Sequence, residues 1–246
     1  MNTLRLTTLA VLAFAAFGCG PRVIMPLVKE CNLPSDQTGT ILGKRATLPV
    51  SIAVAPGIFS EEEITAIERA ADVWNVFFQW SMGKKAIDYG SGKIPEFTGT
   101  QLDPTQATFC TQSDNGVVVI SGTTNFTLGD PTGTLAVTEE CTGSGSPYPA
   151  LNLGIIVANF QSFFRNGNPI SNFQNVMLHE MGHMLGLDHS CSTGGGTGIP
   201  DCDGGGINPS YLNAIMFPSD ERTGGPEASF PNENDQGRMN CLYQGT

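Results

Sequence analysis

The chain has 246 residues, of which 40% are hydrophobic, so it is long enough to form one domain with its own core. Its formal net charge is −11 and it shows no basic patch, which argues against a nucleic-acid-binding protein. This acidity fits a soluble protein that works outside the cell, although it identifies no substrate.

The first residues of the chain predict export. A short apolar run extends from Leu9 to Phe17 and cannot cross a bilayer, which takes roughly 20 helical residues. Such a run is typical of a secretory signal peptide. Gly18-Cys19 at its end resembles the signal of bacterial lipoproteins, in which the cysteine is acylated. We therefore predict a lipoprotein-type signal over residues 1–18 and membrane contact only through a lipid on Cys19, with plain secretion as the alternative.

Seven cysteines are an odd number for an exported protein. If Cys19 carries a lipid, the other six can form three disulfides in an oxidising compartment. We predict a disulfide between Cys191 and Cys202, because it closes a short glycine-rich loop. The other two pairs follow only by elimination: Cys110–Cys141 and Cys31–Cys241.

The first predicted elements follow a stretch without clear periodicity, residues 19–48, which we assign to a tether. Pro49–Ala55 alternates and is rich in branched residues, which predicts a strand. The motif Ser60-x-x-Glu63 is a capping box and predicts the start of a strong helix that ends at Gly83. Apolar residues recur in it at helical spacing and predict one core-facing side: Ile64, Ile67, Ala71, Trp74 and Phe78.

Three more strands and two more helices are predicted further along. The second helix begins near Ser171 or Asn172 and ends at Gly186, and Cys191–Asn208 is a glycine-rich loop. The order of elements predicts an α+β fold with one twisted mixed sheet and two main helices, in a single domain over residues 49–246. The strands are Val117–Ser121, Thr134–Thr138 and Leu151–Ala158, and the last short helix is Asn234–Tyr243.

The segment from His179 to His189 reads HEMGHMLGLDH and predicts a metal site. On a helix, His179 and His183 project from one face a turn apart, so both imidazoles can bind one zinc ion. Gly186 can end the helix in the left-handed conformation, so that the chain turns back and brings His189 to the same ion. Three protein ligands leave the fourth position to water, which is typical of a catalytic zinc site.

Glu180 follows the first ligand and is rotated from it by about 100° around the helix, so it points beside the metal. Zinc lowers the pKa of bound water to about 7, and Glu180 is placed to deprotonate that water and pass the proton to a leaving amine. The chain contains only three histidines and all of them lie in this motif, whereas structural histidines would be scattered.

The histidine segment matches HExxHxxGxxH and therefore resembles the zinc-binding motif of the metzincin metallopeptidases, in which a methionine-containing turn follows. Residues 214–218 (AIMFP) resemble that turn, and the resemblance implies that Met216 lies beneath the zinc ligands in an irregular C-terminal part. The chain is most similar to the matrixins, the matrix-metalloproteinase group, because Ser190 follows the third histidine and Pro218 follows the methionine by two residues.

The similarity to matrixins extends over about residues 49–243. Asp235–Tyr243 is similar to their last helix. The resemblance implies a zinc cleft in which Leu135, Ala136 and Val137 pair with an extended protein or peptide substrate, adding it as a strand. We expect a monomer.

The chain also departs from the matrixin pattern. Matrixins carry a second, structural zinc held largely by histidines, and no histidine is left here to bind one. Residues 31–36 (CNLPSD) faintly resemble their inhibitory segment, which brings a cysteine to the zinc, but cysteine parity favours a paired Cys31. Oxygen ligands of a further loop could bind calcium, although their spacing fits a solvated turn better: Asp201, Asp203 and Asn208.

The sequence thus predicts an extracytoplasmic zinc endopeptidase. Two alternatives stay open: a zinc hydrolase that cuts another acyl bond, such as an amidase, and a non-catalytic surface binding module on a peptidase scaffold. Glu180 argues against the binding module, because a binder needs no general base.

Overall fold

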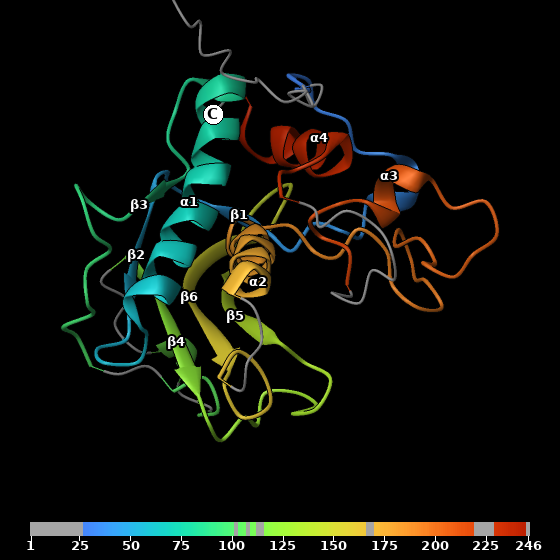
Figure 1. The fold of residues 1–246 in the computed structure, drawn as a ribbon. Helices are drawn as coiled ribbons and strands as arrows, with labels where there is room; N and C mark the ends of the chain where they lie inside the picture. Colours follow the sequence, from blue (N-terminus) through green and yellow to red (C-terminus); the bar gives the residue numbers. More distant parts are fainter. Residues whose placement is uncertain are drawn as a thin grey trace, which may run out of the picture.

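The computed structural model describes residues 27–100, 103–106, 109–111, 116–165, 170–218 and 229–244. The fold is of the mixed α/β type, with six strands in one sheet and four α-helices among these residues (Figure 1). The strands are β1 (Lys44–Arg45), β2 (Val50–Val54), β3 (Ile87–Asp88), β4 (Val117–Thr123), β5 (Ala136–Gly143) and β6 (Ala150–Asn159). The helices are α1 (Glu61–Met82), α2 (Ile170–Met184), α3 (Pro209–Leu212) and α4 (Glu233–Tyr243).

The sheet is mostly parallel. Strands β3, β2, β4 and β6 pair in this order and all run in the same direction, and β1 also pairs in parallel with β6. Strand β5 is the exception, since it pairs antiparallel with β6. Among the described strands β6 is its one partner, so β5 leaves an edge of the sheet free. The mixed sheet that the sequence predicts is confirmed.

The two long helices, α1 and α2, lie side by side on one face of the sheet (Figure 1). The capping box at the start of α1 is confirmed, because Ser60 Oγ accepts the N–H of Glu63 and Glu63 Oε2 accepts the N–H of Ser60. Gly83 ends the helix in the left-handed conformation, with φ of 68°. Trp74 is fully buried, and its Nε1–H donates to the carbonyl of Leu178, 2.9 Å away. This bond joins α1 to α2 just before the histidine motif.

Most predicted strands and helices are confirmed within a few residues, and β5 differs most. It begins at Ala136 and runs to Gly143, well beyond the predicted end at Thr138. Its second half does not alternate clearly and contains an irregularity between Glu140 and Thr142, and it is held in the sheet by pairing with β6. The short helix α3 was not predicted.

Residues 27–48 belong to the same folded body as the rest. β1 extends the sheet beside β6, and Arg45 within it is almost fully buried. Gln37 is also buried, and its side-chain amide donates to the carbonyl of Ser190 at 2.8 Å. The sequence of this stretch lacks periodicity because its structure depends on contacts with residues that are distant in sequence. The predicted signal peptide and the predicted lipid on Cys19 lie outside the described residues.

The three predicted disulfides are confirmed: Cys31–Cys241, Cys110–Cys141 and Cys191–Cys202. Such a set of disulfides indicates a protein outside the cytoplasm. None of the helices in the described part of the chain has the length and apolar character needed to cross a membrane.

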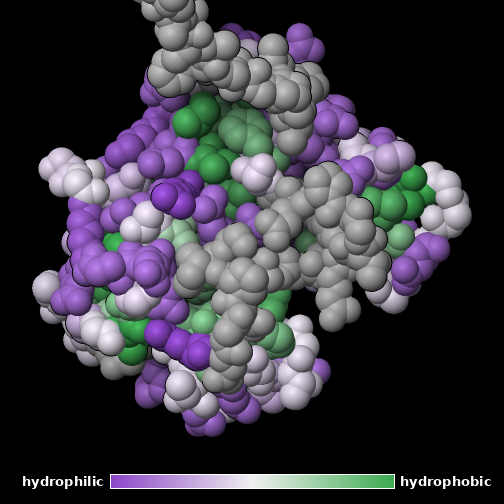
Figure 2. Space-filling model, in the orientation of Figure 1, coloured by the Kyte–Doolittle hydropathy of each residue, from purple (hydrophilic) through white to green (hydrophobic). Residues whose placement is uncertain are grey.

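The surface of the molecule is largely polar in the view of Figure 2, with hydrophobic residues showing over the C-terminal end of α1. The large hydrophobic side chains that the described residues expose are Val76 and Trp80, both on this helix. The ammonium group of Lys29 lies 4.4 Å from the centre of the Trp80 ring, which indicates a cation–π contact.

Replacing the helix cap tests this description of α1. Ser60→Ala removes one acceptor of the capping box and is expected to lower the free energy of unfolding by about 1 kcal/mol. Urea denaturation measures this loss, and Ser91→Ala at an exposed loop position serves as the control. Equal stability of the two variants would contradict a role for the cap.

Candidate metal centre

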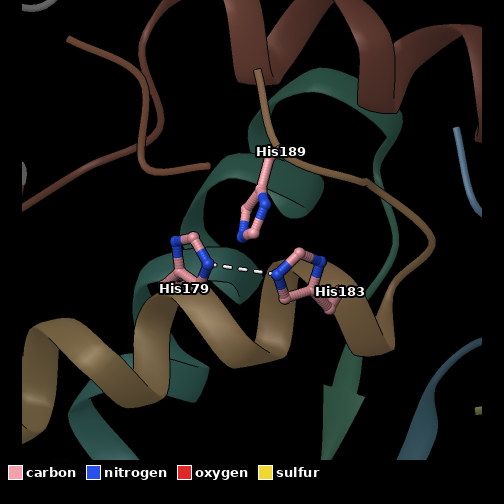
Figure 3. A group of neighbouring side chains, drawn as sticks. All are labelled: His179, His183 and His189. Atoms are coloured by element: carbon pink, nitrogen blue, oxygen red, sulfur yellow. Dashed lines mark hydrogen bonds between the residues drawn. The ribbon is translucent and has the colours of Figure 1, made fainter. Parts of the chain in front are cut away.

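The three histidines converge on one point (Figure 3). His179 and His183 extend from the same face of α2, and His189 approaches from the loop that follows. Each offers a ring nitrogen, and these nitrogens all lie within 4.8 Å of one another. In the described part of the chain, no other group of three His, Cys, Asp or Glu side chains is arranged in this way. The triad could therefore hold a metal ion such as zinc.

Gly186 produces the turn that brings in the third histidine. Its φ is 108°, a left-handed conformation that disfavours other residues. Its N–H bonds to the carbonyl of His183, and the N–H of Leu187 bonds to that of Gly182, so α2 ends here. A Cβ atom at residue 186 would lie 2.1 Å from the carbonyl oxygen of Gly43. The predicted helix end is confirmed, and two independent constraints require glycine.

Backbone carbonyls orient the two imidazoles of α2. His179 Nδ1 lies 2.8 Å from the carbonyl oxygen of Ile215, and His183 Nδ1 lies 2.8 Å from that of Leu187. A carbonyl oxygen can only accept, so each Nδ1 carries the proton and each Nε2 keeps its lone pair. Both lone pairs are thereby available to a metal ion, the arrangement usual for metal-bound histidine.

The spacing of the two Nε2 atoms fits zinc. They lie 3.1 Å apart, the contact marked by the dashed line in Figure 3. With both Nδ1 atoms protonated, neither Nε2 can donate to the other, and their lone pairs repel unless a cation lies between them. Two nitrogens at about 2.0–2.1 Å from a tetrahedral zinc ion are about 3.3 Å apart. The triad and its donor atoms are therefore suited to zinc.

Burial favours the neutral, metal-binding form of two of the histidines, His183 and His189. Burial lowers the pKa of His183 to about 3, and the charge of His189 acts in the same direction. Burial also lowers the pKa of His189, as does the charge of Arg238, whereas Asp188 opposes the shift. No proton therefore has to leave these rings for a metal to bind near neutral pH.

Glu180 lies one residue from the first histidine and is 5% exposed. The hydroxyl of Thr138 in β5 donates to its Oε2 at 2.6 Å. Burial raises the pKa of Glu180 to about 7, and the hydrogen bonds of Thr138 act against this shift. Because its pKa lies near neutral, this carboxyl group can both take up and release a proton under ordinary conditions.

Met216 lies against the metal-binding helix. It is fully buried, and a Cβ atom at Gly182 would lie 2.2 Å from its sulfur. Its carbonyl oxygen accepts the N–H of Ser190 at 2.7 Å, beside the third histidine. The preceding residue, Ile215, supplies the acceptor for His179. This turn thus contacts α2 at Gly182 and also helps to orient the imidazole of His179.

Two buried charges in α4 support the site, and the sequence reasoning missed them. Asp235 accepts the N–H of Ile215 at 2.7 Å and the N–H of Met216 at 3.2 Å. Arg238 donates to the carbonyl of Asp188 at 2.9 Å and lies 3.4 Å from Asp235. Burial raises the pKa of Asp235, while the charge of Arg238 acts in the opposite direction. The sequence does contain a signal for this pair, because Asp235 and Arg238 are oppositely charged and three residues apart. The backbone groups that they bind, however, lie far away in sequence.

The remaining candidate residues are placed as follows. Leu135 directly precedes β5, while Ala136 and Val137 are its first two residues and lie along its free edge. Cys31 is in a disulfide, so it offers no thiol to a metal in this state.

The loop considered for calcium forms turns. Asp201 Oδ1 accepts the N–H groups of Gly194 and Asp203, and Asn208 Oδ1 caps α3 by accepting the N–H of Ser210. These hydrogen bonds hold the loop in turns, and calcium binding by its oxygens stays a prediction.

No protein-family model matches the chain, and no curated protein is significantly similar to it in sequence. What the site can do must therefore be argued from its own residues.

Zinc titration tests the metal centre. The protein is expected to bind one zinc ion per chain, with a stabilisation of about 2.7 kcal/mol at a zinc concentration about 100 times Kd. His189→Ala removes one ligand. Loss of a residue that only supports a ligand weakens metal binding by up to about 100-fold, so loss of the ligand itself should weaken zinc binding by more than about 100-fold. Asp201→Asn is the control and should bind zinc normally. Unchanged affinity in the His189 variant would exclude His189 as a ligand.

The charge pair in α4 gives a second test. Asp235→Asn leaves Arg238 buried without its counter-charge, and the free energy of unfolding should fall by about 3–5 kcal/mol. Zinc affinity should also fall, by about 10–100-fold, since the Ile215 segment loses its anchor. Thermal melting with and without zinc measures both effects, and Glu233→Gln on the exposed side of α4 is the control. A stable variant with normal zinc affinity would contradict this role.

Proposed function

We propose that the protein is a zinc-dependent endopeptidase that acts outside the cytoplasm. The observation that carries the proposal is the convergence of three imidazoles next to a buried carboxyl group, that of Glu180. The similarity of residues 179–189 and of the turn around Met216 to the metzincins, and to the matrixins among them, supports the same function. We further propose export as a lipoprotein with its lipid on Cys19.

The chain's own groups perform the proton transfers. When bound, a zinc ion supplies a Lewis acid that polarises a peptide carbonyl and makes water more acidic. Glu180 takes a proton from the attacking water as its oxygen bonds to the carbonyl carbon. Glu180 then gives this proton to the amide nitrogen as the carbon–nitrogen bond breaks, so the products are a carboxylic acid and an amine. His179, His183 and His189 stay neutral and move no proton.

The free edge of β5 supports an extended peptide as the substrate. β5 packs against α2, and among the described strands it pairs with β6 alone, so its other edge can accept a further strand through main-chain hydrogen bonds. Leu135, Ala136 and Val137 are the residues that we expect to pair with such a strand. Main-chain pairing of this kind accepts many sequences, which fits the cleavage of proteins or peptides in extended segments.

Replacing the general base tests the proposal. Glu180→Gln should still bind zinc but lose casein cleavage by about 10²–10⁴-fold, because an amide cannot take the proton. Glu62→Gln on the exposed face of α1 is the matched control. Phenanthroline should stop cleavage by the natural protein, and added zinc should restore it.

The outcomes separate the alternatives. A Glu180 variant that cleaves casein normally would contradict the assigned role. A natural protein that binds zinc and cleaves no peptide bond, but hydrolyses a non-peptide amide, would be an amidase. Zinc binding with no hydrolysis of either kind would favour the binding module.

A further inference from the structure

We propose that Thr138 is a positioning residue for the general base: its hydroxyl group holds the Glu180 carboxylate in the orientation that accepts a proton from water. The inference rests on the proposed function, since it assigns a role within the same reaction. It adds a residue that lies outside the histidine motif, in β5, the strand that packs against α2.

The contact between the two side chains is short and partly buried. Thr138 Oγ1 lies 2.6 Å from Glu180 Oε2 and 3.1 Å from the backbone carbonyl oxygen of the same residue. A hydroxyl group has one proton, and the shorter distance falls in the range of charge-assisted bonds to a carboxylate, about 2.5–2.7 Å. The carboxylate is therefore the main acceptor. A polar group as buried as the Glu180 side chain costs free energy unless it is hydrogen-bonded.

Thr138 donates a hydrogen bond to one carboxylate oxygen of Glu180, Oε2, and not to the other, Oε1. Among the described residues, no group donates a hydrogen bond to Oε1 of Glu180, and Thr138 is the one side chain that bonds to Oε2. Oε1 is then the oxygen that takes the proton from water, while Oε2 stays bound to Thr138 throughout. A carboxylate that is held through Oε2 keeps one orientation, so Oε1 stays available to take the proton.

The alternation of β5 explains why this hydroxyl faces the helix. Side chains two residues apart point to the same face of a strand, which places Ala136, Thr138 and Glu140 on the side of α2. Ala136 belongs to the core that α2 also forms. Glu140 accepts hydrogen bonds from Arg45, whose Nε donates to the carbonyl of Met184 at 3.0 Å, at the end of α2. β5 therefore holds the metal-binding helix at two places, and Thr138 is one of them.

The residue type also suits the task. Threonine is branched at Cβ, so its χ1 angle is restricted and the hydroxyl is presented with little loss of conformational freedom. The backbone at residue 138 is fixed as well, because it pairs with Ile156 of β6. The same strand begins with Ala136 and Val137, which together with the preceding Leu135 pair with the substrate in the proposed function. One strand thus orients both the peptide and the base that attacks it.

This geometry predicts which kinetic constant changes. Removing the hydroxyl leaves the main-chain groups of β5 in place, so substrate binding and KM should change by less than about twofold. The carboxylate loses its fixed orientation, and kcat should fall by about 10–100-fold, the loss typical for a supporting contact of a metal site. A merely structural role would instead appear as a lower melting temperature with a normal kcat.

The experiment compares zinc-loaded variants on one peptide substrate. Thr138→Val removes the hydroxyl at nearly constant shape and should show the fall in kcat at normal zinc content, whereas Thr138→Ser keeps the hydroxyl and should restore most of it. Thr142→Val, exposed on the same strand, is the control. Thr138→Ala replaces the valine variant if valine is not accommodated. Crystal structures of the zinc-loaded variants give a readout other than activity: Glu180 should adopt several orientations without the hydroxyl and one with it.

The outcomes distinguish this inference from the proposed function. If the natural protein cleaves the peptide and the valine or alanine variant has the same kcat, with Glu180 in its original orientation, Thr138 is not a positioning residue. Equal loss in the serine and valine variants also overturns the inference. If the natural protein shows no zinc-dependent cleavage, the proposed function fails and the inference fails with it. A fall in kcat in the valine variant that the serine variant does not show supports both the inference and the proposed function.

Discussion

The bonds from two imidazole Nδ1 atoms to backbone carbonyls are the interactions on which the metal centre depends. Ile215 and Leu187 supply the two oxygens, each at 2.8 Å. Because carbonyls only accept, they determine both the tautomer and the tilt of His179 and His183. The remaining nitrogens must then face each other at 3.1 Å, an arrangement of lone pairs that is favourable only around a cation.

The two carbonyls belong to segments that are held by helix α4 and by the stretch around Leu42. Asp235 in the last helix accepts the N–H groups of the Ile215 turn, and Arg238 binds the carbonyl of the residue before His189. At the other end, the N–H of Leu42 donates to the carbonyl of Gly186. Buried polar groups are costly unless they are paired, and most of these are paired with backbone atoms of the site. The geometry of the candidate metal centre therefore depends on residues outside the histidine triad.

Much of the framework is predictable because its signals are local. The capping box at Ser60, the helix ends at Gly83 and Gly186, and the histidine spacing all depend on residues within one or two turns of each other. The histidine motif also implies the turn that brings in His189, because only a chain reversal lets all three rings meet. Cysteine parity indicated three disulfides and loop length indicated Cys191–Cys202, whereas neither signal selects the pairing of the other four cysteines.

The supporting contacts were not predictable, because they join residues that are distant in sequence. Arg45 lies in a stretch without periodicity, yet its side chain bonds to Met184 and Glu140 and its N–H to the hydroxyl of Tyr243. The bond from Thr138 to Glu180 likewise crosses from a strand to a helix. Periodicity indicates which face of an element is buried, but it does not say which backbone groups a buried polar side chain will meet. Those partners are set by how the elements pack.

The disulfide between Cys31 and Cys241 joins residues 210 positions apart, so it closes nearly the whole domain into a covalent ring. Two smaller rings, through Cys110–Cys141 and Cys191–Cys202, lie within it. One backbone cut anywhere inside the large ring leaves a single molecule, in which the severed ends stay attached to the same core. For the proposed peptidase, whose copies could nick one another's loops, this topology means that one scission within the large ring detaches no fragment.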